Sequence, residues 1–146
     1  MANIRSEIIS IQDTIINWRR HFHKDPELSF KELRTGKLIA KELRSMGLEP
    51  KTKVGKTGIT ADLEFGNGPM IAFRADMDAL PIQETSGLPY SSNNDGVMHA
   101  CGHDGHMAIL LGAAKVLARK KKQFKGRVRF IFQPAEEGLG GARYMI

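Results

Sequence analysis

The spacing of apolar residues changes along this chain, and that change constrains the fold more than any other feature. From Ile4 to Phe22, apolar side chains recur every three or four residues, which is the period of an amphipathic helix. From Ile59 to Phe65 they alternate with polar residues, which is typical of a half-buried strand. A chain that carries both periods predicts an α/β domain, in which helices flank a layered sheet.

Two helices are expected in the first third of the chain. The first covers residues 4–22, where six apolar residues form one stripe: Ile4, Ile8, Ile11, Ile15, Trp18 and Phe22. It ends before Asp25-Pro26, because the residue before a proline avoids the helical region. The second helix begins at a capping box formed by Ser29 and Glu32, and it ends near Gly47.

The rest of the chain predicts strands on either side of a third helix. Residues 59–65 and 70–73 form a hairpin whose turn is Gly66-Asn67-Gly68. Residues 76–98 show no sustained period, and a long irregular stretch in a compact domain is usually functional. A helix follows over residues 105–119, then a strand over 128–132 that ends at Gln133-Pro134, and the last residues begin another helix near 140.

The charge and the apolar runs restrict the function. The net charge is +6, but seven of the basic residues lie within residues 119–129, where no acidic residue occurs. We interpret this segment as a solvated connection between a helix and a strand, in preference to a nucleic-acid patch, because Phe124 is its only aromatic residue. The most apolar run, residues 107–117, contains Lys115, so no membrane span is expected.

Cysteine usage and the first residues indicate the compartment. Cys101 is the single cysteine, so no internal disulfide can form. The first residues do not have the form of a signal peptide. Both observations predict a cytoplasmic protein.

Two clusters of polar residues could carry chemistry before the last strand. Asp76 and Asp78 follow an apolar strand and point the same way if the strand continues, although a polar loop with a cap and a turn is the alternative. In residues 98–107, Cys101 and His103 straddle Gly102 and can converge on one metal ion. Asp104 can accept a hydrogen bond from one of these metal ligands and orient it. His99 and His106 add to the cluster, and the alternative is that these histidines are packed or solvated.

A third cluster follows the last strand, at Glu136 and Glu137. Adjacent carboxylates repel each other, so burying both requires a cation beside them. One can bind a metal while its neighbour, which faces the other way, acts as a general base on metal-bound water. A solvated pair of glutamates in a loop is the alternative. Together with the cysteine and histidine cluster, the pair predicts a hydrolytic metal site.

These three clusters, with the opening segment over residues 18–30, resemble the N-terminal part of a known enzyme family. The family comprises the metal-dependent amidohydrolases of the aminoacylase, hippurate hydrolase and indole-acetyl-amino-acid hydrolase type, a branch of the zinc aminopeptidase-like carboxypeptidases. The resemblance covers essentially the whole chain. It implies that residues 1–146 are a partial catalytic domain with a phosphorylase/hydrolase-like fold. The dimerisation domain and the C-terminal part of the catalytic domain would be absent, which would leave apolar sheet surface exposed.

The resemblance also implies roles for particular residues. Cys101, His103 and Glu137 match ligands of a centre that holds two divalent ions, which could be Zn, Mn, Co or Ni. Glu136 matches the general base, and Asp78 matches a carboxylate that positions the site. Two further histidine ligands of the family would lie beyond residue 146.

The reaction that the resemblance implies is hydrolysis of the amide bond of N-acyl amino acids, impaired in a chain of this length. The alternative is a non-catalytic, metal-binding remnant of such an enzyme. The implied partner is a small-molecule substrate, with no nucleic acid and no membrane. The resemblance implies a homodimer for the full-length protein and leaves the oligomeric state of this chain open.

Overall fold

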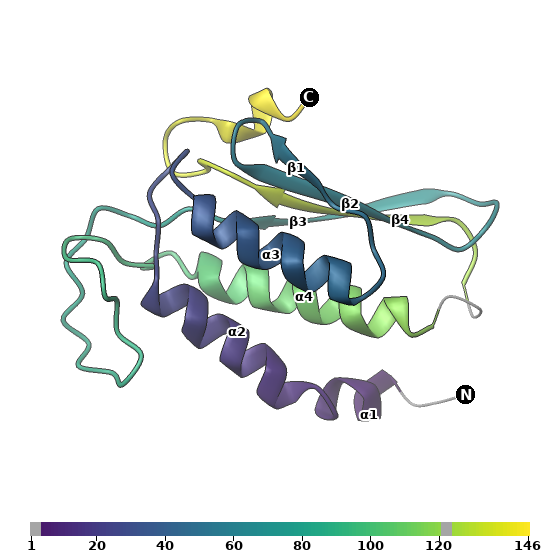
Figure 1. The fold of residues 1–146 in the computed structure, drawn as a ribbon, viewed down its shortest axis with the longest axis horizontal. Helices are drawn as coiled ribbons and strands as arrows, with labels where there is room; N and C mark the ends of the chain where they lie inside the picture. Colours follow the sequence, from purple (N-terminus) through teal and green to yellow (C-terminus); the bar gives the residue numbers. More distant parts are fainter. Residues whose placement is uncertain (1–3, 121–123) are drawn as a thin grey trace.

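The computed structural model describes residues 4–120 and 124–146, and it confirms an α/β fold in which helices flank a four-stranded sheet. The helices are α1 (Ile4–Ile9), α2 (Gln12–Lys24), α3 (Leu33–Ser45) and α4 (His103–Ala118). The strands are β1 (Lys51–Val54), β2 (Gly58–Glu64), β3 (Met70–Asp76) and β4 (Arg127–Gln133). Helices α3 and α4 lie against the sheet, and α2 packs on α4 (Figure 1). Among the described residues, no helix is both long enough and apolar enough to cross a membrane.

The first expected helix is in fact two helices, α1 and α2, which are separated at Ser10 and Ile11. The Ser10 hydroxyl donates to the backbone carbonyl of Glu7, and the Ile11 N–H donates to the carbonyl three residues back instead of four. A serine side chain that competes for helix carbonyls interrupts the regular ladder in this way. The apolar stripe is interrupted too: Trp18 and Phe22 are buried, whereas Ile4 and Ile8 are about half exposed.

The predicted capping box at the start of the second helix is wrong. Helix α3 has no side-chain cap, and Ser29 and Glu32 do not bond to each other's backbone. Ser29 instead donates to the Asp78 carboxylate, and the Glu32 side chain accepts hydrogen bonds from Thr57 and from the backbone of Ala135. Both side chains are used for tertiary contacts, which a pattern local to the sequence cannot reveal. The expected end near Gly47 is confirmed by backbone bonds that close the last turn of α3.

The predicted hairpin between β2 and β3 is also wrong, because β4 lies between these two strands. The sheet order is β1-β2-β4-β3, in which β4 runs antiparallel to β2 and parallel to β3. Strand β4 begins beside the turn between β2 and β3. There the Gly126 carbonyl accepts a hydrogen bond from Phe65 N–H, and Arg127 N–H donates to the Pro69 carbonyl. The alternating pattern therefore identified both strands but not their partners. Strand β1, which pairs with β2, was not predicted.

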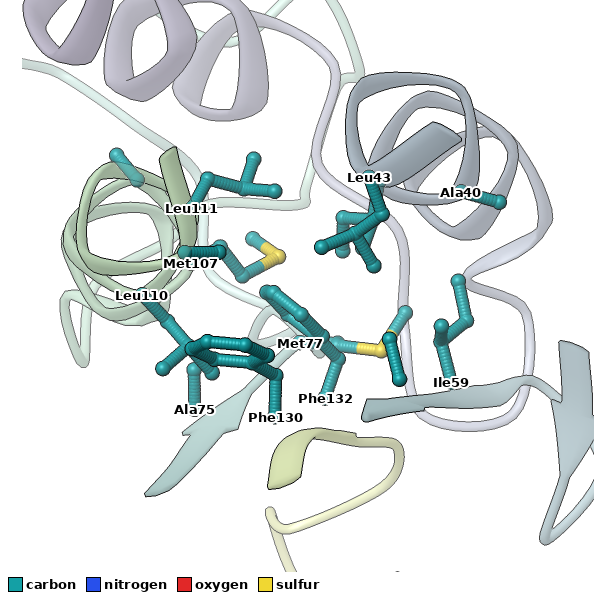
Figure 2. Packing of buried hydrophobic residues seen from close by; sticks show 14 of the residues in the cluster. Ala40, Leu43, Ile59, Ala75, Met77, Met107, Leu110, Leu111, Phe130 and Phe132 are labelled. Atoms are coloured by element: carbon teal, nitrogen blue, oxygen red, sulfur yellow. The ribbon is translucent and has the colours of Figure 1, made fainter. Parts of the chain in front are cut away.

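The core lies between the sheet and the helices (Figure 2). Strand β4 contributes Phe130 and Phe132, both fully buried, and helix α4 contributes Met107 and Leu111 from above them. Burying a large apolar side chain contributes roughly 1.5–3 kcal/mol. The expected strand over residues 128–132 and the helix over 105–119 are both confirmed, as β4 and α4.

Strand β3 leaves apolar side chains in solvent, as the family resemblance implied. It is the edge strand beside β4, and Met70, Ile71 and Phe73 are each about half exposed. Ile109 of the neighbouring helix α4 is two-thirds exposed. A strand in parallel pairing is usually covered on both faces. This edge of the sheet is therefore an uncovered apolar surface.

In the basic segment, residues 119–129, several of the described side chains pair with acidic residues, and the chain ends in a short turn. Four basic residues pair with acids: Arg119 and Lys120 with Glu7, and Arg127 and Arg129 with Asp62. Lys121 and Lys122 lie outside the described residues. The helix expected near residue 140 is instead a short 3₁₀ turn, Gly141–Tyr144.

Two glycines of α4 give a matched test of helix packing. A Cβ at Gly112 would lie 2.7 Å from the Ile15 side chain of α2, whereas a Cβ at Gly105 would meet nothing within 4 Å. We expect Gly105→Ala to stabilise the fold by up to about 1 kcal/mol, because alanine favours helix. Gly112→Ala should lose that gain and destabilise by about 1 kcal/mol or more, because Ile15 must shift. Urea unfolding of both variants measures the difference, and equal stabilities would contradict this view of the α2–α4 contact.

Candidate metal centre

The three polar clusters of the sequence meet at one end of the sheet. Strands β3 and β4 are parallel, so their carboxyl ends lie at the same edge. Asp78 follows β3, Glu136 and Glu137 follow β4, and His103 begins α4 directly beside them. In α/β sheets this edge is where sites usually form.

Three predicted ligands converge there. Single ligand atoms of Cys101, His103 and Glu137 all lie within 4.8 Å of one another. Gly102 makes this possible, because it adopts a left-handed conformation with φ 82° between the cysteine and the histidine. The Cys101 thiol is exposed, and the neighbouring Glu137 carboxylate raises its pKa. A metal ion that binds the thiolate must therefore displace a proton.

The ring of His103 has one nitrogen free for a ligand. Its Nδ1 lies 2.8 Å from the backbone carbonyl oxygen of Asp78. A carbonyl only accepts, so Nδ1 carries a hydrogen and Nε2 faces the other candidate ligands. Burial alone would lower the pKa of His103, but the hydrogen bonds to Asp78 and the charges of Asp76 and Asp78 raise it to about 9. At neutral pH a metal ion that binds Nε2 must therefore displace a proton. The arrangement fixes the orientation that a metal-binding imidazole needs.

The Asp78 carboxylate holds the loop that carries the two glutamates. It accepts hydrogen bonds from Ser29 Oγ at 2.6 Å, Glu136 N–H at 2.9 Å and Glu137 N–H at 3.0 Å. Burial would raise the pKa of Asp78, but these bonds and the His103 side chain lower it to about 2. Asp78 is therefore ionised at neutral pH, and it contacts the candidate ligands from behind.

Both glutamates face the same imidazole, contrary to the expectation that the two point in different directions. Glu136 Oε2 lies 3.8 Å from His103 Nε2, and Glu137 Oε1 lies 3.9 Å from the same atom. Glu137 is the more buried of the two, with 20% of its side chain exposed against 40% for Glu136. Its Oε1 has no hydrogen-bond partner within the described residues. A buried carboxylate oxygen without a partner is costly, and a cation would remove that cost.

Glu32 supports this turn, although sequence reasoning assigned it to a helix cap. Its fully buried carboxylate accepts from Ala135 N–H at 2.9 Å and from the Thr57 hydroxyl at 2.5 Å. Burial raises the pKa of Glu32. Ala135 has φ 51°, a conformation that side-chain-bearing residues rarely adopt, and it immediately precedes Glu136. The Glu32 hydrogen bond helps to hold this strained residue in place.

The prediction that Asp104 supports a metal ligand is wrong, because its carboxylate bonds to residues of α2. Its Oδ2 bonds to His23 Nδ1 at 2.9 Å and to Arg19 Nε at 3.2 Å, both in α2. Successive residues of a helix point about 100° apart, so Asp104 faces α2 when its neighbour faces the sheet edge. His23 Nε2 also bonds to Glu84, which ties the irregular stretch after β3 to α2. Asp78 holds the histidine instead.

The other histidines of the cluster take separate places. His99 is buried, its ring nitrogens make no hydrogen bond among the described residues, and burial lowers its pKa to about 4, so it is neutral at pH 7. His106 lies one turn beyond His103 on α4, beside Asp76 rather than Asp78. Strand β3 ends at Asp76, so the condition for a shared orientation of the two aspartates, a strand that continues to Asp78, is not met. Their separation by two residues was the only sequence signal for Asp76.

Comparison with known proteins gives a consistent result. A family model described as peptidase family M20/M25/M40 matches residues 72–146. The hippurate hydrolase of Campylobacter jejuni is 50% identical over 99% of this chain, which covers 37% of that relative. The N-acyl-L-amino acid amidohydrolase of Geobacillus stearothermophilus is 45% identical over 98% of this chain and 39% of its own length. The chain thus spans less than two fifths of these relatives.

A solved structure has the same fold. The YXEP protein of Bacillus subtilis, described as a dinuclear metal binding peptidase from the M20 family, superposes with a TM-score of 0.88. It is 48% identical, and the match covers 92% of this chain and 38% of that one. The sheet and helices described above are therefore those of this kind of metal-binding protein.

The lowered pKa of Asp78 predicts how stability depends on pH. A carboxylate whose folded pKa is about 2, against 3.8 for the free group, contributes stability above pH 3.8 that is lost as pH falls towards 2. That contribution is about 2 kcal/mol. We expect Asp78→Asn to flatten the fall in the free energy of unfolding between pH 4 and pH 2, measured by urea unfolding. Glu32 has an opposite shift that both proteins share, so it cancels in the comparison. Parallel pH profiles would contradict the role given to Asp78.

Proposed function

Because the chain belongs to peptidase family M20/M25/M40, we propose that it is the N-terminal part of the catalytic domain of a metal-dependent amidohydrolase, which cleaves the amide bond of N-acyl amino acids. The observation that carries the proposal is the convergence of Cys101, His103 and Glu137 at the sheet edge. The names of the hippurate hydrolase and the N-acyl-L-amino acid amidohydrolase support the substrate class.

The donor set fits a divalent ion. Zinc and related ions bind thiolates, imidazole nitrogens and carboxylate oxygens. The cluster offers all three: the Cys101 thiol, His103 Nε2 on the side of the ring away from the Asp78 carbonyl, and a Glu137 oxygen that has no hydrogen-bond partner among the described residues. Zinc, manganese, cobalt and nickel are all consistent with this mixture. When bound, such an ion supplies Lewis-acid polarisation of the substrate carbonyl and a more acidic water.

The chain's own residues supply proton transfer and orientation. Glu136 is the more exposed glutamate and lies at the open side of the cluster, so it can take a proton from a water molecule and pass it to the leaving amino group. Asp78 fixes the backbone of Glu136 and Glu137 while its carbonyl fixes the imidazole of His103. The base and the ligands are therefore positioned by one residue, which favours a constant geometry during the reaction.

The proposal extends to partners and compartment. The substrate is a small N-acyl amino acid, the complete enzyme holds two ions and forms a homodimer, and neither nucleic acid nor a membrane is a partner. The pairing of four basic residues with Glu7 and Asp62 supports the absence of a nucleic-acid site. A metal-binding thiolate is best preserved in a reducing compartment, which supports the cytoplasm.

The roles of the two glutamates separate catalysis from metal binding. We expect Glu136→Gln to lower kcat for N-acyl amino acid hydrolysis by about 10²–10⁴-fold while the metal content stays unchanged, because only proton transfer is lost. Glu137→Gln should lose bound metal and activity together. The measurements are hydrolysis of a panel of N-acyl amino acids with added divalent ions, and metal content by elemental analysis, on the protein as its source cells make it.

Glu49→Gln is the matched control, because Glu49 is exposed and lies outside the cluster. It should leave both activity and metal content unchanged. Metal binding without any hydrolysis by the unaltered protein would refute the enzyme and favour the alternative, a non-catalytic metal-binding remnant. Hydrolysis that survives Glu136→Gln would refute the general base.

A further inference from the structure

Two further potential ligands, Asp76 and His106, lie next to the first group and have no role in the proposed hydrolysis. Asp76 ends β3, and His106 lies in the first turn of α4 with about half of its side chain exposed. Their facing atoms, Asp76 Oδ2 and His106 Nδ1, are 3.7 Å apart. One ligand atom each of Asp76, His103 and His106 lie within 4.8 Å of one another.

The Asp76 carboxylate is buried and incompletely satisfied. The residue is only 6% exposed, and its Oδ1 has no hydrogen-bond partner among the described residues. Arg74 Nε lies 3.4 Å from that oxygen, but the guanidinium is about half exposed and donates its hydrogen bond to Gln133. A buried carboxylate is stable only with close charge compensation. A cation bound beside Asp76 would therefore compensate the charge of this buried carboxylate.

The two groups share His103. His103 Nδ1 donates to the Asp78 carbonyl, so Nε2 is the nitrogen left for an ion in either group. One lone pair binds one ion at a time. An ion beside Asp76 and His106 therefore competes for His103 with an ion beside Cys101 and Glu137.

The two groups differ in chemical softness. The Cys101 group offers a thiolate, which thiophilic ions such as Cd²⁺ and Zn²⁺ prefer. The Asp76 group offers a carboxylate and imidazoles, which suit Mn²⁺. It also opens into a groove of about 460 Å³, which Phe73, Ile109 and Ala113 line, so an ion can reach it from solvent.

We propose that Asp76, His103 and His106 form a second divalent-metal site, which selects Mn²⁺ over thiophilic ions and shares His103 with the Cys101 group. Thiophilic ions such as Cd²⁺ then occupy the Cys101 group, and Mn²⁺ occupies the site at Asp76 and His106. The inference concerns metal binding alone and does not depend on hydrolysis.

The test is Mn²⁺ titration followed by the EPR signal of the free ion, on the protein as its source cells make it. Asp76→Asn keeps the shape of the side chain, and His106→Gln changes a half-exposed residue, so both variants are expected to fold. Each should weaken Mn²⁺ binding on the order of tenfold or more. His21→Gln, an exposed histidine on α2, is the matched control and should leave Mn²⁺ binding unchanged.

A second readout separates this site from the proposed active centre. Cd²⁺ bound to Cys101 produces ultraviolet thiolate charge-transfer absorption. We expect Cys101→Ser to abolish that absorption and to leave Mn²⁺ affinity within about twofold of the unaltered protein, whereas Asp76→Asn and His106→Gln keep the absorption. Absence of the absorption in the unaltered protein would count against the proposed active centre alone.

Two results would overturn the second site. One is Mn²⁺ affinity that is unchanged in Asp76→Asn and His106→Gln, which would mean that Asp76 serves only as the partner of Arg74. The other is Mn²⁺ binding that Cys101→Ser removes, which would place the ion in the Cys101 group. Circular dichroism of each variant identifies any loss of binding that comes from unfolding.

Discussion

The geometry of the site depends on the hydrogen bonds that the buried Asp78 carboxylate accepts. It follows β3, yet it accepts hydrogen bonds from Ser29 before α3 and from the backbone N–H groups of Glu136 and Glu137 after β4. Its carbonyl meanwhile orients His103 at the start of α4. Four segments that are distant in the sequence are thus joined at one buried residue. Hydrogen bonds to a buried carboxylate are stronger than those between neutral groups, so this junction is well suited to hold the ligands rigidly.

Glu32 has a similar role at a greater distance from the ligands. Its buried carboxylate reaches the backbone of Ala135, whose positive φ turns the chain sharply before the two glutamates. The site is therefore built on two buried acids with opposite pKa shifts: burial dominates at Glu32, and hydrogen bonding dominates at Asp78. Neither acid needs to touch a substrate to affect the chemistry, because each fixes the backbone from which the ligands extend.

The shared nitrogen of His103 links the proposed active centre to the second metal site. The helix places His103 and His106 one turn apart, so one imidazole faces the carboxyl end of β4 and the next faces the end of β3. The same helix leaves Ile109 exposed beside the uncovered edge strand β3. The candidate metal ligands and the exposed apolar residue Ile109 therefore lie on neighbouring turns of α4.

The sequence by itself determined most of the helices and strands, although not β1 or the break between α1 and α2. It also singled out Cys101, His103 and Glu137 as candidate ligands, and the structure brings these three side chains together. Local periodicity and residue spacing carry that information, because both act over a few residues. Only the tertiary structure decided that β4 separates β2 from β3, that Ser29 and Glu32 bond to distant partners instead of a helix end, and that Asp104 faces α2. These outcomes depend on which buried polar groups find partners across the core, and nothing in a local pattern specifies the far end of a hydrogen bond.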